Sequence, residues 1–142
     1  MILIRPAIHQ DAVAISRVHV ESWRTTYTGI VPEQYLATLN EAERVPLWLE
    51  WLTRDIRTYV ADLDGKIVGF ISGGAIREPV LTYDAELYAI YMLESAQRQG
   101  IGTALLKELA GSLLSAGFKS MIVWVSRRIL RKTSMRNRAR RL

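Results

Sequence analysis

The amino-acid sequence predicts an α/β (α+β) fold in one domain. Two observations support this prediction. After a short first strand, apolar residues follow helical spacing, change to a period of two after Arg57, and return to helical spacing from Gly102. Within the alternating region, Asp64-Gly65 is a typical hairpin turn. A chain of 142 residues suits a single core, and the predicted order of elements is β-α-α-α-β-β-β-α-β.

The first third of the chain reads as one strand followed by three helices. Residues 1–6 read as a strand with Ile2 and Ile4 on one face, and residues 9–27 carry an apolar stripe after Asp11, whose carboxylate suits a first helical turn. A short helix is expected over 32–39. A third helix is expected over 40–52, because its first residues have the spacing of a capping box.

The remaining elements are more strongly patterned. Strands are expected over 57–62 and 66–72 around the hairpin turn. The segment 85–93 is apolar on both faces, which predicts a central strand. A strongly amphipathic helix is expected over 102–116, and a buried strand over 121–125.

The charge is divided very unevenly along the chain. All 14 acidic residues and 11 of the 19 basic residues precede Ser126, so residues 1–125 carry −3 and residues 126–142 carry +8. The basic character therefore belongs to the tail alone. A nucleic-acid partner is not expected, because only the tail could bind phosphates by charge.

Other function classes have little support. The chain has no cysteine, no apolar run of the length that spans a bilayer, and an N-terminus unlike a signal peptide, so a cytoplasmic location without membrane attachment is expected. His9 and His19 have no neighbouring ligands at metal spacing and are interpreted as structural or surface residues. No metal site is expected.

The segment Gln97 to Thr103 is the best candidate for chemistry. It lies between a predicted strand and a predicted helix, and its glycines allow a sharp turn and close approach to a ligand. The first N–H groups of a helix have no partner within the helix and favour an anion such as a pyrophosphate. A simple tight turn is the alternative.

The surrounding sequence makes the interpretation specific. ELYAIYMLESAQRQGIGTALLKELA resembles the cofactor motif of the GNAT superfamily of N-acetyltransferases, Gln/Arg-x-x-Gly-x-Gly/Ala after a strand, which Gln97, Gly100 and Gly102 match. The resemblance extends to ILIRPAIHQDAVAI, DGKIVGF and GFKSMIVWV. It implies a mixed, mostly antiparallel sheet flanked by helices, and an acetyl-CoA site.

The resemblance also implies the residues of that site. Met92 and Leu93 would offer backbone groups to the pantetheine arm where the strand separates from its neighbour. The pyrophosphate would be surrounded by main-chain N–H groups of Gln97, Arg98, Gln99, Gly100, Ile101, Gly102 and Thr103. One departure is Glu94, where the family often has proline.

Glu86 stands where the family often has a carboxylate base. The alternative is a solvated charge at a strand end. The family's usual proton donor is a tyrosine in a later motif, approximately Asn-Pro-x-x-x-x-Phe-Tyr, which this sequence lacks. Tyr88 and Tyr91 are interpreted as strand-face or core residues and do not take over that role.

The acceptor pocket is expected at the end of the first long helix. Trp23, Arg24 and Tyr27 lie where the family often binds its amine, and SWRTTYTGIVP resembles that region of a bacterial subgroup. Packing in the core is the favoured alternative for Trp23. Trp48 and Trp51 are interpreted as core residues.

Residues 1–125 are therefore expected to form an incomplete GNAT-type domain, and residues 126–142 an atypical basic tail without the family's last strands. A frameshift near Ser126 is our hypothesis for this truncated end. The tail is expected to be disordered or loosely helical. The uncovered sheet edge would then favour self-association as a homodimer.

The expected function is transfer of acetyl from acetyl-CoA to a primary amine of a small molecule or peptide by direct attack. This chain is expected to be impaired, because the tyrosine motif is absent. The alternative is a non-catalytic remnant that binds CoA or serves a structural role.

Overall fold

A computed structural model describes residues 1–27, 41–53, 56–77, 83–123 and 138–141. It contains one six-stranded sheet in the order β1-β2-β3-β4-β5-β6. Neighbouring strands are antiparallel except β4 and β5, which are parallel. The strands are β1 Ile2–Pro6, β2 Arg57–Leu63, β3 Lys66–Ala75, β4 Ala85–Met92, β5 Ser120–Val123 and β6 Arg138–Arg141. The predicted mixed, mostly antiparallel sheet is confirmed.

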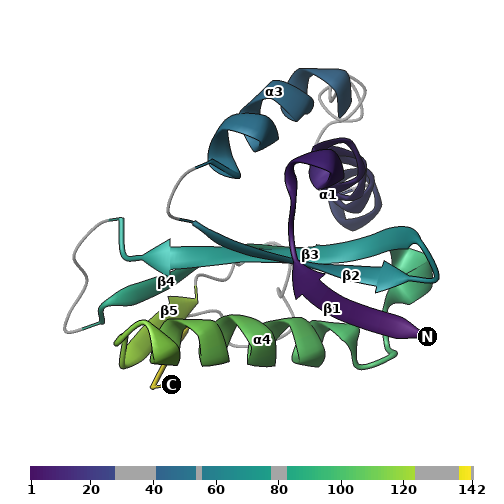
Figure 1. Ribbon diagram of the computed structural model, residues 1–142. Helices are drawn as coiled ribbons and strands as arrows, with labels where there is room; N and C mark the ends of the chain where they lie inside the picture. Colours follow the sequence, from purple (N-terminus) through teal and green to yellow (C-terminus); the bar gives the residue numbers. More distant parts are fainter. Residues whose placement is uncertain (28–40, 54–55, 78–82, 124–137, 142) are drawn as a thin grey trace.

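Helices cover both faces of the sheet (Figure 1). Helices α1 (Ala12–Tyr27) and α3 (Glu41–Trp51) lie over one face, and α4 (Ile101–Ser115) lies against the other. Short 3₁₀ turns, η1 (His9–Asp11) and η2 (Glu94–Ala96), precede α1 and α4. The three long predicted helices are confirmed, whereas the predicted helix over 32–39 lies outside the described residues.

The core forms where these layers meet. The buried residues of α4 are Ile101, Leu105, Leu109 and Leu113, one on each successive turn of a single face. They pack on β2 and β3, and β3 is buried along nearly its whole length because helices cover it on both sides. The predicted central strand, β4, lies between β3 and β5 as expected.

The end of the chain differs from the prediction. Residues 138–141 form β6, which pairs with β5 from Ser120 opposite Arg141 to Val123 opposite Arg138. The expectations that no strand follows residue 125 and that the tail is disordered or helical are therefore wrong for these four residues. Within the described part of the chain β5 has neighbours on both sides, so the homodimer expected from its open edge loses that basis.

The start of α1 is set by a buried carboxylate. Asp11 receives hydrogen bonds from Arg5 at 2.8 and 3.0 Å and from the N–H of Ile8 at 2.8 Å. Burial, the largest single effect, opposes the charge of Asp11, but the hydrogen bonds from Arg5 and Ile8 together with the charge of Arg5 outweigh it, so the pKa of Asp11 is lowered. Because Asp11 lies in η1, α1 begins at Ala12 and not at His9.

His19 lies in an aromatic cluster between α1 and the sheet. Its ring centroid is 4.8 Å from that of Tyr91, 6.2 Å from that of Phe70 and 6.3 Å from that of Trp48. Its Nδ1 is buried and has no hydrogen-bond partner among the described residues. Burial, with a smaller effect of Arg44, lowers the pKa of His19 to about 4. Trp48 is buried beside it, as expected.

This environment predicts acid sensitivity. The unfolded chain, with a His19 pKa of about 6.5, binds more protons than the folded chain down to about pH 4. The free energy of unfolding should therefore fall on acidification from pH 6.5 to pH 4, by on the order of 2 kcal/mol after allowing for partial exposure. Urea unfolding between pH 5 and 6.5 measures the upper part of this change in the free energy of unfolding. His19→Phe should flatten this dependence and His9→Gln should not, whereas equal slopes in all three proteins would contradict the assignment.

Candidate functional site

The predicted loop joins the end of β4 to the start of α4. After η2 the backbone is left-handed at Arg98, with φ 66°, and again at Gly100, with φ 76°. A side chain is strained in that conformation, which explains the glycine at position 100. A Cβ there would meet no protein atom within 4 Å, so the space beside this residue is open.

The N–H groups of this loop are available to a ligand. The N–H of Gln97 donates to the carbonyl of Glu94 at 3.2 Å, and the N–H of Ala104 donates to the carbonyl of Gly100 at 3.1 Å. Between them, the N–H groups of residues 98–103 make no hydrogen bond to other described residues. A row of unbonded N–H groups at the positive end of a helix favours a phosphate or pyrophosphate.

Gly102 has a different role, which is packing. A Cβ at Gly102 would lie 3.1 Å from Cε of Met92, and a Cβ at Gly69 would lie 2.9 Å from Cγ of Met92. The Met92 side chain thus fits between two glycines, one on β3 and one in the first turn of α4. Gly102 therefore joins α4 closely to the end of β4, while Gly100 makes the turn.

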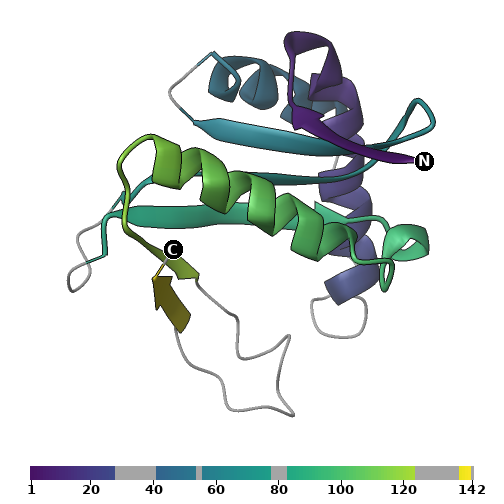
Figure 2. The same ribbon diagram turned by 60° about the horizontal axis from the view of Figure 1, so that its bottom comes forward.

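Strand β4 extends well beyond its pairing with β5. The last described pair is Leu87 opposite Val123, and β4 continues to Met92 (Figure 2). Along that stretch the edge of β4 away from β3 has no strand partner among the described residues. This separation is where the pantetheine arm is expected from the sequence.

Met92 and Leu93 differ in which of their backbone groups are available to a ligand. The N–H of Leu93 donates to the carbonyl of Val68 at 2.9 Å, and its carbonyl accepts from Ala96 at 2.9 Å. Both of its backbone groups are therefore engaged. Backbone groups of successive strand residues point to opposite sides, so those of Met92, which lies opposite Gly69, face away from β3. Of these two residues, only Met92 presents a backbone N–H toward the open edge.

Glu86 is not a solvated charge, because only 4% of it is exposed. Its carboxylate accepts hydrogen bonds from the N–H of Arg77 at 3.0 Å and from the Arg77 guanidinium at 3.2 and 2.6 Å. The same guanidinium lies 4.4 Å from the ring centroid of Tyr88. Tyr88 donates its hydroxyl to the carbonyl of Ala75, as suits a strand-face residue.

The predicted acceptor residues lie at the end of α1. The indole N–H of the half-buried Trp23 donates to the hydroxyl of Tyr91 at 3.2 Å, so Trp23 both packs and links α1 to β4. Arg24 is exposed. The side chain of Tyr27 lies outside the described residues. The link to Tyr91 and a second one from Ser22 were not predicted from the sequence, because contacts this distant in the chain leave no local pattern.

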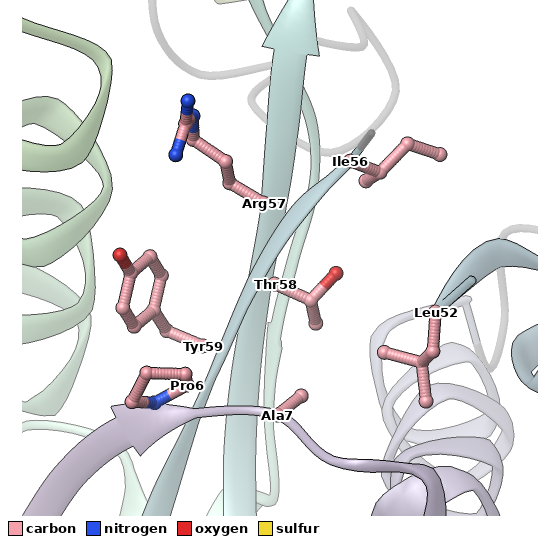
Figure 3. A pocket seen from close by; sticks show the side chains of 7 residues that line it. All are labelled: Pro6, Ala7, Leu52, Ile56, Arg57, Thr58 and Tyr59. Carbon is pink, nitrogen blue, oxygen red and sulfur yellow. The ribbon is translucent and has the colours of Figure 1, made fainter. Parts of the chain in front are cut away.

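A pocket of about 240 Å³ lies away from the loop between β4 and α4 (Figure 3). Arg57, in its wall, bonds through Nη1 to Oγ of Ser112 at 3.0 Å. Ser112 is roughly 16 Å along α4 from its first residue, so the pocket is not the loop site. Its lining residues are Pro6, Ala7, Leu52, Ile56, Arg57, Thr58 and Tyr59.

The described residues contain neither a metal cluster nor a membrane-spanning helix. No group of three or more His, Cys, Asp or Glu residues in that part of the chain is placed to hold a metal ion. None of its helices has both the length and the apolar character required to cross a membrane.

Most of this sequence matches known proteins. Residues 18–132 match the model of the acetyltransferase (GNAT) family. YuaI of Bacillus subtilis (strain 168), described as an uncharacterized N-acetyltransferase, is 48% identical over 127 residues, which cover 88% of this chain and 72% of that protein.

Solved structures share the fold. The PaiA N-acetyltransferase of Thermoplasma acidophilum, in complex with coenzyme A, aligns with a TM-score of 0.78 and 26% identity over 93% of this chain and 84% of that one. A ribosomal-protein-alanine N-acetyltransferase of Brucella melitensis aligns with a TM-score of 0.67 and 28% identity, over 85% and 72% of the two chains.

Proposed function

This chain belongs to the acetyltransferase (GNAT) family, and from that premise we propose that it transfers the acetyl group of acetyl-CoA to a primary amine of a small molecule or a peptide. The observation that carries the proposal is the row of unbonded N–H groups of residues 98–103, beside the stretch of β4 that has left β5. The coenzyme A complex of the Thermoplasma relative supports it.

In this proposal, groups of this chain bind and orient acetyl-CoA. The N–H groups from Arg98 to Thr103 hold the pyrophosphate, with Gln97 at the start of the loop, and the N–H of Met92 donates a hydrogen bond to a carbonyl of the pantetheine arm. Acetyl-CoA supplies the acetyl group as a thioester. The amine nitrogen bonds to the acetyl carbon as the carbon–sulfur bond breaks, the nitrogen loses one proton, and the thiolate gains one.

Glu86 is the proposed acceptor of the amine proton, and Trp23, Arg24 and Tyr27 are proposed to line the amine pocket. The ribosomal-protein-alanine N-acetyltransferase of Brucella melitensis supports a peptide amine, and the same site suits a small molecule. In this proposal residues 1–125 form the catalytic domain. A cytoplasmic location belongs to the same proposal and is supported by the absence of cysteine.

Two features support reduced activity. Residues 126–142 contain no tyrosine, so the family's later donor motif is missing from this chain. Arg77 already bonds to both carboxylate oxygens of Glu86 and competes with any amine for them. These observations favour the second candidate function, a non-catalytic protein that binds CoA.

One experiment separates the two functions. Calorimetric titration with acetyl-CoA measures binding, and release of the CoA thiol is then followed with a panel of amines and N-terminal peptides. We expect micromolar binding, slow release, and a further loss of about 100-fold in release for Glu86→Gln with binding unchanged. Arg77→Met, which breaks the same ion pair but keeps the carboxylate, should retain the activity.

Each result has a definite meaning. Loss of activity in Arg77→Met equal to that in Glu86→Gln would mean that the ion pair, and not a base, is what the reaction needs. Binding without release for every amine would establish the non-catalytic function. A folded protein that binds no acetyl-CoA would refute both.

A further inference from the structure

Two consecutive residues of α1 are bonded to two consecutive residues of β4. The Ser22 hydroxyl donates to the carbonyl of Met92 at 2.9 Å, and the Trp23 indole donates to the Tyr91 hydroxyl at 3.2 Å. Ser22 is only 4% exposed, so little water can replace its hydrogen bond. Both contacts lie at the end of β4, next to the loop that begins α4.

These contacts constrain Met92 from several directions. Its side chain is enclosed between Gly69 and Gly102, where added Cβ atoms would come within 2.9 and 3.1 Å of it. Its carbonyl is held by Ser22. The backbone N–H is its remaining polar group, and it faces the edge of β4 that lacks a strand partner among the described residues.

This arrangement suits the binding of acetyl-CoA in the proposed function. A backbone N–H binds a ligand carbonyl well only if it is already held in the required direction, because ordering it during binding costs affinity. Strand β3 holds this backbone on one side, where Met92 lies opposite Gly69 and Leu93 bonds to Val68. On the other side β5 pairs with β4 only as far as Leu87 in the described residues, so no described strand holds the outer side of Met92. Ser22 provides a constraint on that outer side, because the Met92 carbonyl that it holds faces away from β3, as the Met92 N–H does.

We propose that Ser22 is a positioning residue for acetyl-CoA. It holds Met92 so that the N–H of Met92 meets the pantetheine arm, and through Trp23 the same turn of α1 links the amine side to the cosubstrate side. This inference rests on the proposed function. It adds a residue of α1, distant from the glycine loop in sequence, to the determinants of cosubstrate binding.

The helix itself offers a matched control. Ser16 lies on α1, is buried like Ser22, and its hydroxyl has no hydrogen-bond partner among the described residues. Ser16→Ala and Ser22→Ala therefore remove the same atom from the same helix at similar burial. Only the second removes a hydrogen bond to β4. Ser22→Thr keeps the hydroxyl and serves as the conservative variant.

The experiment is calorimetric titration of the full chain and these variants with CoA, together with their melting temperatures. Ser22→Ala should weaken CoA binding about tenfold, Ser16→Ala less than about twofold, and Ser22→Thr should recover most of the loss. Equal CoA affinity for Ser22→Ala and Ser16→Ala, whatever their melting temperatures, would overturn the inference. If the unaltered protein binds no CoA, the proposed function itself fails, and the inference fails with it.

A second measurement does not depend on a variant that folds. Amide hydrogen exchange in the unaltered protein should show the Met92 N–H protected when CoA is added, because that group would then be hydrogen-bonded. The N–H of Leu93, already bonded to Val68, is the internal reference and should change little. No added protection at Met92 in a protein that binds CoA would overturn the inference.

Discussion

Replacing Gly100 with valine is expected to weaken acetyl-CoA binding by at least about 30-fold. Gly100 has φ 76°, which a β-branched residue avoids at a cost of about 1–2 kcal/mol. The variant must either accept that strain or turn the neighbouring N–H groups away from the ligand. Its side chain would also enter the open space beside the loop, where no protein atom lies within 4 Å of a Cβ. Calorimetric titration measures the loss.

The other end of the same helix provides the control. Gly117 follows α4, has φ 98°, and a Cβ added there would also meet no atom within 4 Å. Gly117→Val should therefore lower the melting temperature about as much as Gly100→Val but leave acetyl-CoA affinity within about twofold. If Gly117→Val impaired binding equally, the effect would be one of general stability, and the loop would lose its assigned role.

Gly73→Ala is expected to lower the free energy of unfolding by about 3 kcal/mol. A Cβ at this position would lie 2.9 Å from the carbonyl oxygen of Glu86 and 2.9 Å from Cδ2 of Leu109. The Leu109 side chain could shift, but the oxygen belongs to the backbone of the neighbouring strand. Relief therefore requires β3 and β4 to move apart or α4 to lift from the sheet. Urea unfolding measures the change.

The control for this variant lies on α4. A Cβ at Gly111 meets no atom within 4 Å, and alanine is the better helix former, so Gly111→Ala should stabilise the protein by about 0.5–1 kcal/mol. Adding Leu109→Ala to Gly73→Ala should not restore stability, because the backbone oxygen remains in place. A loss below about 1 kcal/mol for Gly73→Ala would contradict the close packing of α4 on β3.

Much of this protein follows from its sequence alone. The Asp64-Gly65 turn and the alternation around it predict the β2–β3 hairpin, which the structure confirms. The leucines of α4 predict the face that it buries. The glycine loop, read with its neighbouring strand and helix, predicts an anion site at the start of α4, and that site stays a prediction. These features are local, because each depends on residues within about one or two turns or strand lengths.

The partners of individual side chains required the tertiary structure. The family resemblance predicts a base at Glu86, yet only the arrangement of β3 and β4 brings Arg77 onto its carboxylate. The register between these strands shifts at Ser72 and Gly73, and such irregularities decide which residues face each other.

The open edge of β4 and the strand at the end of the chain also depend on tertiary contacts that the sequence does not reveal. The composition of residues 138–141 suggests a solvated tail, whereas their pairing with β5 makes them a strand. Ser22 shows in sequence only as a small residue on an amphipathic helix. Its bond to Met92 spans 70 positions of the chain and exists because α1 crosses the sheet where β4 ends. Periodicity determines which face of an element is buried, but contacts between distant elements depend on how those faces pack together.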